Sequence, residues 1–185
     1  MTDKSALRRC CLEERKVIPA DTFDKKVKAV TAKLFSSDEY KSAGLILSYV
    51  SVENEFPTRE IIERSLLLGK KVAVPYIENC KMEFKFISSL SDLVPGAYNI
   101  PTSRGETVTA FDNAFCVTPA LCTDYSFYRL GYGGGYYDRF INEHVGVFYT
   151  VPCFSEFILD EIPHNTYDQK VDCIISEKLI GRRCV

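Results

Sequence analysis

The clearest chemical signal in the sequence is a glycine loop flanked by arginines. It reads Arg129-Leu-Gly-Tyr-Gly-Gly-Gly-Tyr-Tyr-Asp-Arg139 and holds four of the ten glycines of the chain. Glycine permits positive φ and lets backbone N–H groups approach an anion without a Cβ in the way. The two arginines add fixed positive charge and forked donors that match phosphate oxygens. The pattern therefore predicts an anion site; the alternative is a plain glycine turn whose tyrosines pack as core.

The loop differs from two common phosphate-binding motifs. No Lys-Ser or Lys-Thr pair follows the glycines, which excludes a P-loop, and Tyr136 stands where a dinucleotide fingerprint has its third glycine. A helix predicted over residues 136–142 would add the positive end of its dipole at the same place. An RNA-contacting Gly-Tyr-Arg tract is a further alternative, which the shortness of the segment disfavours.

Three charged residues extend the predicted anion site. Asp138 closes the loop, and a carboxylate beside bound phosphates is a typical ligand of Mg²⁺. It could equally be a helix N-terminal charge or a partner of Arg139. Lys4 and Arg8 lie one turn apart on a predicted helix, where they would contact phosphate or form a solvated face.

Hydrophobic periodicity predicts the elements that must position these residues. Helical patterns cover residues 4–16, a second helix that follows a cap at Asp21, and residues 58–68, where Gly69 ends the helix. Buried strands are expected at residues 44–49, 71–75, 114–118, 146–151 and 171–176. Residues 82–86 alternate in polarity, which predicts a strand with one wet face at a sheet edge. Helices and strands that alternate in this way indicate an α/β fold whose mostly parallel sheet is covered on both sides.

Composition excludes several classes of protein. The chain has 185 residues, 46% of them apolar, and its 23 basic and 25 acidic side chains leave a net charge of −2, so a nucleic acid is not an expected partner. The longest apolar runs, such as residues 44–52, are far too short to span a bilayer, so a membrane is not expected either. The charged first twenty residues do not form a secretory signal, so we expect a cytoplasmic protein whose eight cysteines stay reduced. No pair of cysteines has C-x-x-C spacing, which disfavours a zinc site. We expect one domain over residues 1–185.

The glycine segment, extended to Phe140, resembles the signature of the 5-formyltetrahydrofolate cyclo-ligase family, also called methenyltetrahydrofolate synthetase. Other pieces follow in the family order. They are Lys4-x-x-Leu-Arg8, Glu55 leading into Thr58-Arg-Glu-Ile-Ile62, the strand that ends at Pro75, Ile100-Pro101, Pro119, Asp124 and Asp168-x-x-Val-Asp172. The resemblance covers nearly the whole chain.

The resemblance implies a three-layer α/β/α fold and an enzyme that uses ATP and Mg²⁺ to convert 5-formyltetrahydrofolate into 5,10-methenyltetrahydrofolate, ADP and phosphate. We expect it to act as a monomer. The residues implied for ATP are Lys4, Ser5, Ala6, Leu7, Arg8, Arg129, Leu130, Gly131, Tyr132, Gly133, Gly134, Gly135, Tyr136 and Tyr137. Those implied for the folate are Val50, Glu55, Tyr132, Gly133, Gly134, Gly135 and Tyr136. Asp138 and Asp168 are implied for magnesium, and Arg129, Tyr136 and Asp138 for catalysis.

Four positions depart from the family pattern: Ala120, Phe127, Phe157 and Tyr167. Phe127 replaces an expected glycine, so the connection from Asp124 to Arg129 is expected to take another path, and the other departures concern the loop and the rim of the folate pocket. Without the resemblance, Glu55 would be an exposed loop acid. Two rival functions stay open, because a fold does not fix a function: a sugar-phosphate isomerase or acyl-carrier transferase, and a non-catalytic folate or nucleotide binding module.

Overall fold

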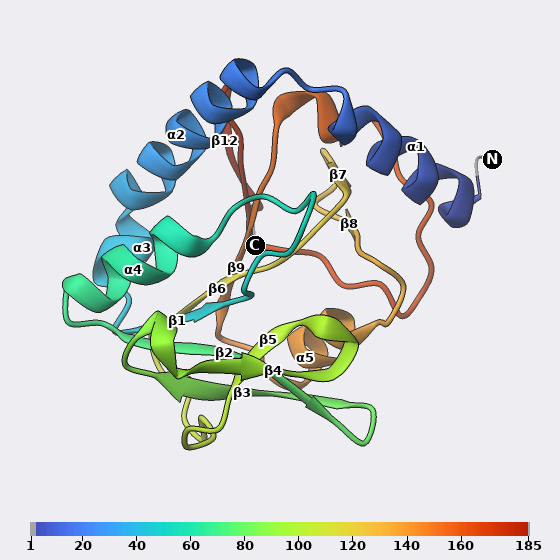
Figure 1. Cartoon of the computed structure of the whole chain (residues 1–185). Coiled ribbons are helices and arrows are strands. Elements are labelled where there is room, and N and C mark those ends of the chain that lie inside the picture. Colours follow the sequence, from blue (N-terminus) through green and yellow to red (C-terminus); the bar gives the residue numbers. More distant parts are fainter. Residues whose placement is uncertain (1–2, 185) are drawn as a thin grey trace.

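The computed structural model describes residues 3–184. Its central sheet contains β1 (Leu45–Ser48), β2 (Lys71–Glu78), β3 (Lys81–Ile87), β6 (Ala114–Val117), β9 (Phe148–Pro152), β11 (Cys173–Ile175) and β12 (Ile180–Arg182). The strands lie in the order β12-β11-β9-β6-β1-β2-β3 (Figure 1). The five inner strands run parallel, and the two edge strands are antiparallel to their neighbours. The predicted α/β fold with a mostly parallel sheet is confirmed.

Helices cover both faces of this sheet (Figure 1). They are α1 (Lys4–Lys16), α2 (Ala20–Ser36), α3 (Asp38–Ser42), α4 (Arg59–Leu67) and α5 (Tyr136–Glu143). Strand β1 shows why two layers form, since its side chains alternate between two buried clusters: Ile46 packs with Val30 and Ile61 of α2 and α4. Its neighbour Leu47 packs in the cluster that holds Phe140 of α5. A strand with both faces apolar therefore requires a helix on each side.

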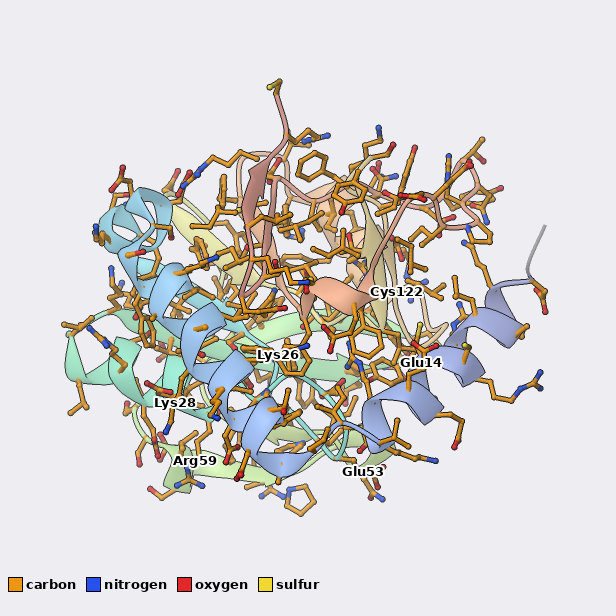
Figure 2. The ribbon with its side chains drawn as sticks, turned by 90° about the horizontal axis from the view of Figure 1, so that it is seen from above. Glu14, Lys26, Lys28, Glu53, Arg59 and Cys122 are labelled. Atoms are coloured by element: carbon orange, nitrogen blue, oxygen red, sulfur yellow. The ribbon has the colours of Figure 1, made fainter. Side chains whose placement is uncertain are left out.

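Smaller elements complete the structure. Strands β7 (Cys122–Asp124), β8 (Arg129–Leu130) and β10 (Ile158–Leu159) form a sheet in the order β10-β7-β8, and β4 (Leu93–Pro95) pairs with β5 (Pro101–Ser103). Three 3₁₀ turns are η1 (Leu90–Asp92), η2 (Ala97–Asn99) and η3 (Ser155–Phe157). Seen from above, α1 and α2 follow one another along one side, and Cys122 of β7 lies near α1 (Figure 2). Within residues 3–184, no helix is both long and apolar enough to cross a membrane.

Most predicted element boundaries hold, and one needs correction. Gly69 has φ +72° and its N–H donates to the carbonyl of Leu66 (2.9 Å), so the prediction that it ends α4 is confirmed. The prediction of Asp21 as a helix cap is wrong. Helix α2 already begins at Ala20 with Pro19 at the cap position, and Asp21 lies in the first turn, where its charge faces the positive end of the helix dipole.

Candidate active site

The candidate site is a cavity of about 500 Å³ at the carboxyl ends of the central parallel strands. The loop after β1 contributes Val50 and Glu55, and Pro119 follows β6. The glycine loop, the first turns of α1 and the loop at Asp168 close it on other sides. In sheets of this class, ligands bind beyond the carboxyl ends of the strands, so this is where a substrate is expected.

The glycine loop has the backbone shape that its composition predicts. Gly133 and Gly135 have positive φ, +107° and +64°, which other residues rarely adopt. A Cβ on Gly134 would lie 2.8 Å from the ring of Tyr136, so a side chain there would force the ring to move. Gly135 is the N-cap residue of α5, and no side chain caps this helix end. Backbone N–H groups of the first turn are thus available to an anion.

Arg129 on β8 supplies a buried positive charge to the same cavity. Its side chain is only 3% exposed, and its Nη2 lies 3.2 Å from Oδ1 of Asp138. Its guanidinium also lies over the ring of Tyr137, 5.4 Å from the ring centre. Nε and Nη2 nevertheless have no hydrogen-bond partner among the described residues. Buried donors are seldom left without partners, and only Nη2 of the two has a charge partner, Asp138, so this guanidinium can still donate to an anionic ligand.

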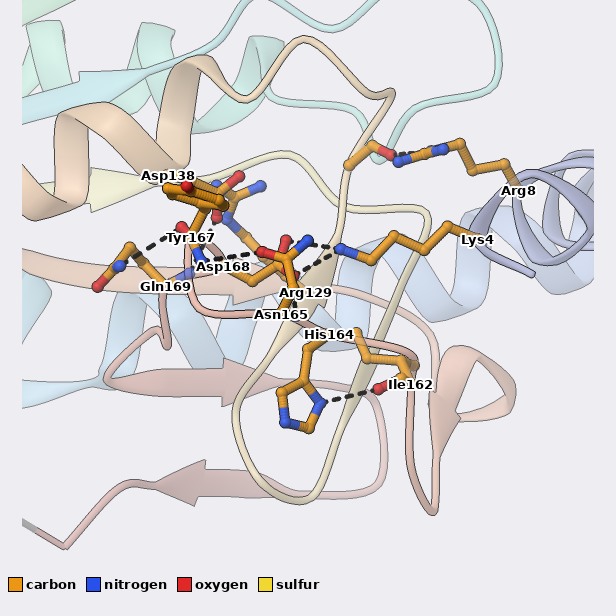
Figure 3. Close-up of polar contacts among 11 residues, drawn as sticks. Lys4, Arg8, Arg129, Asp138, Ile162, His164, Asn165, Tyr167, Asp168 and Gln169 are labelled. Carbon is orange, nitrogen blue, oxygen red and sulfur yellow. Dashed lines mark hydrogen bonds and ion pairs between the residues drawn. The ribbon is translucent and has the colours of Figure 1, made fainter. Parts of the chain in front are cut away.

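Two acids at the cavity edge each pair with a cation (Figure 3). Asp168 accepts hydrogen bonds from Nζ of Lys4 at both oxygens, 2.8 and 2.6 Å, and from the backbone N–H of Asn165, 2.6 Å. Asp138 pairs with Arg129 and accepts from the backbone N–H of Gln169 at the same oxygen, Oδ1, 3.1 Å. The alternative that Asp138 pairs with Arg139 is therefore wrong. Arg139 instead donates to the carbonyl of Gly134 and lies over Tyr136.

The residues fit a magnesium site in donor chemistry. Both acids offer the hard oxygen ligands that Mg²⁺ prefers, and Mg²⁺ commonly takes only one or two from protein. Within residues 3–184, Oδ2 of Asp138 makes no hydrogen bond or ion pair, whereas both oxygens of Asp168 accept from Lys4. Among residues 3–184, no three His, Cys, Asp or Glu side chains are grouped to hold a metal by themselves.

Glu55 lines the cavity from the loop after β1, and a hydrogen bond within this loop orients its side chain. Its Oε2 accepts from the backbone N–H of Val52 (2.9 Å), and its carboxylate interacts electrostatically with Tyr132, which lines the same cavity. Burial raises the pKa of Glu55 above the ordinary value of 4.5, because the charged form loses hydration. Burial likewise raises the pKa of Tyr132 well above 10. Glu55 is therefore a partly desolvated acceptor rather than an exposed loop acid.

Comparison with known proteins identifies the family. The model of the 5-formyltetrahydrofolate cyclo-ligase family matches residues 1–177. The chain belongs to this family. It is 28% identical over 162 residues to a Schizosaccharomyces pombe protein named "Probable 5-formyltetrahydrofolate cyclo-ligase", covering 77% of the chain and 79% of the relative. It is 25% identical to the 5-formyltetrahydrofolate cyclo-ligase of Mycolicibacterium smegmatis, covering 95% and 94%.

A solved structure agrees with this assignment. The NMR structure of Aquifex aeolicus 5,10-methenyltetrahydrofolate synthetase superimposes with a TM-score of 0.82 at 26% identity, covering 97% of this chain and 92% of that one. The resemblance drawn from the glycine signature is thus confirmed, as are membership in an enzyme family and the α/β fold.

The cavity of this cyclo-ligase family member contains most of the residues that its signature implicates. Lys4, Arg8, Val50, Glu55, the whole segment 129–138 and Asp168 line it. Ser5, Ala6 and Leu7 do not, and Leu7 packs against the core instead. Helical geometry explains the difference, because positions 4 and 8 share one face of α1 and positions 5–7 point elsewhere.

Sequence patterns missed several residues of the site. Pro75, Ile77, Met82 and Ile100 form an apolar wall of the cavity. Pro75 and Ile100 were noted only as pieces of the family pattern, and none of the four was assigned to the site, because apolar residues in and around a β-hairpin also serve as core. Arg15 was also missed. It donates from Nη1 to the carbonyl of Asn54 (3.0 Å), beside Glu55, and from Nη2 to the carbonyls of Ala120 and Leu121 (2.7 and 2.9 Å). Its spacing from Lys4 and Arg8 on one helix face was the available signal.

The departures from the family pattern have structural explanations. Phe127 adopts φ +70°, a left-handed conformation that suits the glycine it replaces, and its N–H donates to the carbonyl of Asp124 (3.0 Å). The chain closes a tight turn at this point, and the expectation of a path that differs from the family's stays a prediction. The buried carboxylate of Asp124 fixes this turn by accepting from the N–H groups of Ser126 and Tyr128. Phe157 is buried beneath Arg15 and Tyr167 is exposed; neither lines the cavity.

Proposed function

We propose that this protein catalyses the ATP-dependent cyclisation of 5-formyltetrahydrofolate to 5,10-methenyltetrahydrofolate, with release of ADP and phosphate. The observation that carries the proposal is Arg129. Its buried guanidinium has two nitrogen atoms without hydrogen-bond partners, and it lines the same cavity as the glycine loop and Glu55. This combination suits a phosphate group that must meet the uncharged heterocycle of the substrate.

The reaction requires a leaving group. The formyl carbon on N5 belongs to an amide, so it is a poor electrophile, and closing the ring onto N10 requires its oxygen to depart. When that oxygen attacks the γ-phosphorus of ATP, an O–P bond forms and the bond to the β-phosphate oxygen breaks, which releases ADP. N10 then attacks the activated carbon and loses its proton, which the departing phosphate can accept, and the C–O bond breaks as inorganic phosphate leaves. ATP is consumed stoichiometrically.

The protein residues contribute positioning and charge rather than a nucleophile. Phosphoryl transfer mainly needs in-line geometry and stabilisation of charge on the phosphoryl oxygens. We assign the triphosphate to the N–H groups of the glycine loop and to Arg129, Arg8 and Lys4, which line one cavity. Arg8 is already fastened to this loop, since its Nε donates to the carbonyl of Gly131 (2.8 Å). Asp138 and Asp168 would hold magnesium, which neutralises phosphate charge when bound.

We assign the folate to Glu55 and the apolar wall. The Glu55 carboxylate can accept paired hydrogen bonds from the amino-pyrimidinone edge of the pterin, a geometry that suits a carboxylate. The apolar side chains of Pro75 and Met82 offer a dry surface for flat rings, and Tyr132 and Tyr136 have amphipathic rings that suit a heterocycle. We assign Tyr136 to the reacting centre with Arg129 and Asp138.

The test follows methenyltetrahydrofolate absorbance after mixing purified protein with 5-formyltetrahydrofolate, with and without ATP, while ADP is measured in parallel. We expect absorbance only with ATP, with one ADP formed per methenyl product. Arg129→Met should abolish formation of the methenyl product. Arg59→Met should leave it unchanged, because Arg59 is an exposed arginine on α4 that pairs with Glu63. Binding of both ligands without absorbance would establish the binding module instead, and ATP left intact in the presence of folate would favour an isomerase.

We further propose that the chain acts as a single-domain monomer in the cytoplasm, with neither nucleic acid nor membrane as partner. Two observations support this proposal. All eight cysteines are free thiols, as in a reducing compartment, and the net charge of −2 gives no basic excess. Sedimentation of the purified protein tests the monomer, because a dimer would sediment measurably faster.

A further inference from the structure

In the structure, Lys4 and Asp168 form an ion pair with each other, although the proposed reaction requires each of them to bind a different partner. Nζ of Lys4 contacts both carboxylate oxygens of Asp168, at 2.8 and 2.6 Å, across 164 positions of sequence (Figure 3). The proposed function gives Lys4 to a nucleotide phosphate and Asp168 to magnesium. Both assignments cannot hold while the two side chains hold each other, because an ammonium group and a divalent cation compete for the same oxygens.

We propose that the Lys4 ammonium occupies the cation position at Asp168 until nucleotide binds, so that a divalent cation enters only together with nucleotide. This inference rests on the proposed function. When the triphosphate arrives, Lys4 moves to a phosphate oxygen and Asp168 becomes free to ligate the cation that the nucleotide brings. Lys4 is thus a positioning residue that sets the order in which cation and nucleotide bind.

Charge balance at the cavity favours this exchange. Asp168 is paired with Lys4, and Asp138 is paired with the buried Arg129, so neither acid has an uncompensated charge. A divalent cation added alone would find two neutralised carboxylates and would meet two positive side chains in a partly dehydrated site, where like charges repel strongly. A polyphosphate brings the negative charge that both the cation and Lys4 require.

The two partners differ in how firmly they are held. Lys4 is the first residue of α1, its side chain is 25% exposed, and a flexible four-carbon stem lets its ammonium reach a new partner. Cys11 is the only fully buried residue of α1, and Leu7 and Leu12 pack against the core while remaining partly exposed. Asp168 is fixed by a turn: it accepts from the N–H of Asn165 (2.6 Å), and its own N–H donates to the carbonyl of Asn165 (3.2 Å). The carboxylate therefore stays in place when the ammonium leaves.

The experiment measures Mn²⁺ binding to the full chain by the loss of the electron paramagnetic resonance signal of free Mn²⁺, without any nucleotide or folate. We expect weak binding by the wild-type protein and at least about tenfold tighter binding by Lys4→Met, because one positive charge beside the carboxylates is removed. Lys4→Met/Asp168→Asn should lose the gain. Lys16→Met is the matched control, since it removes a charge from the same helix whose partner is the exposed Glu13.

Several outcomes would overturn the inference. Equal Mn²⁺ affinity of Lys4→Met, Lys16→Met and wild-type protein would show that Lys4 does not exclude the cation. Tight Mn²⁺ binding by the wild-type protein that Asp168→Asn abolishes would show that cation and ammonium do not compete. Circular dichroism of each variant, together with Lys4→Gln as a second substitution, separates these results from a folding defect. The Mn²⁺ experiment does not depend on turnover, so its result is independent of the absorbance assay that tests the proposed function.

Discussion

Replacing Asp138 by asparagine should destabilise the fold as well as reduce activity. Arg129 is 3% exposed, and Asp138 is its one ion-pair partner among the described residues. Removing one partner of a buried pair costs about 3–5 kcal/mol, because the remaining charge is buried without compensation. Asp138 is itself 20% exposed, so the lower end applies. For a chain of this length, about 3 kcal/mol corresponds to a melting temperature lower by about 6–12 °C. Activity should fall by about a hundredfold or more, since one charge that supports phosphoryl transfer is lost.

Circular dichroism melts and the methenyl absorbance assay measure the two effects separately. The matched control is Asp168→Asn, whose partner Lys4 is 25% exposed and which should cost at most about 1 kcal/mol. The double variant Arg129→Met/Asp138→Asn should recover most of the lost stability, because no buried charge remains, but none of the lost activity. The reasoning is refuted if Asp138→Asn melts like the wild-type protein, or if the double variant melts below Asp138→Asn.

Three further predictions concern single residues. Glu55→Gln should raise the folate KM more than the ATP KM. It should also raise the melting temperature at pH 7, because burial raises the pKa of Glu55 and the charged form of this side chain therefore destabilises the fold. This gain in melting temperature should vanish as the pH falls toward 4.5, where Glu55 of the wild-type protein becomes protonated. Equal changes in both KM values, or a gain independent of pH, would contradict the assignment. Phe127→Gly should be more stable than Phe127→Ala by about 1 kcal/mol in urea titrations, because alanine keeps the strain of φ +70° and glycine does not; equal stabilities would mean that the turn relaxes. Gly133→Ala and Gly146→Ala both place a Cβ at φ +107° and should lose similar stability. Only Gly133→Ala should lower activity at limiting ATP. A loss of activity in both variants would show that the effect comes from reduced stability.

The elements that the sequence predicted correctly are those whose patterns are local. Phe23, Val27, Val30 and Leu34 recur at helical spacing, and α2 contains all four. The apolar run of β1 is buried along its whole length. Strands of two or three residues leave no such pattern: β10 exists because Ile158 pairs with Thr123, a contact that depends on the whole fold. Local periodicity cannot report a pairing between segments that far apart.

The shape of the glycine loop was predictable because the conformational freedom of glycine is a property of single residues. The ion pairs of the loop were not predictable in this way. Asp138 and Arg139 are neighbours in sequence, which made them natural partners to propose. On a helix, however, adjacent side chains point in different directions. Asp138 therefore faces Arg129 of β8, and Arg139 turns toward Tyr136 and Gly134. Proximity in sequence therefore suggested the wrong partner for Asp138, because the geometry of the helix determines which side chain it faces.

Helix α1 shows how a face that looks solvated can instead hold the site together. Lys4, Arg8 and Arg15 lie on one face, and each reaches a different loop: Lys4 the loop of Asp168, Arg8 the glycine loop, and Arg15 the loop beside Glu55. The arginine donors on backbone carbonyls contribute about 1.5–3 kcal/mol each, and Cys11 is the one fully buried residue of α1. Polar contacts therefore add to the packing of Leu7, Cys11 and Leu12 in holding the helix, so a ligand that competes for those polar groups also changes how α1 is held. A helix fixed by apolar burial could not respond to a phosphate in this way.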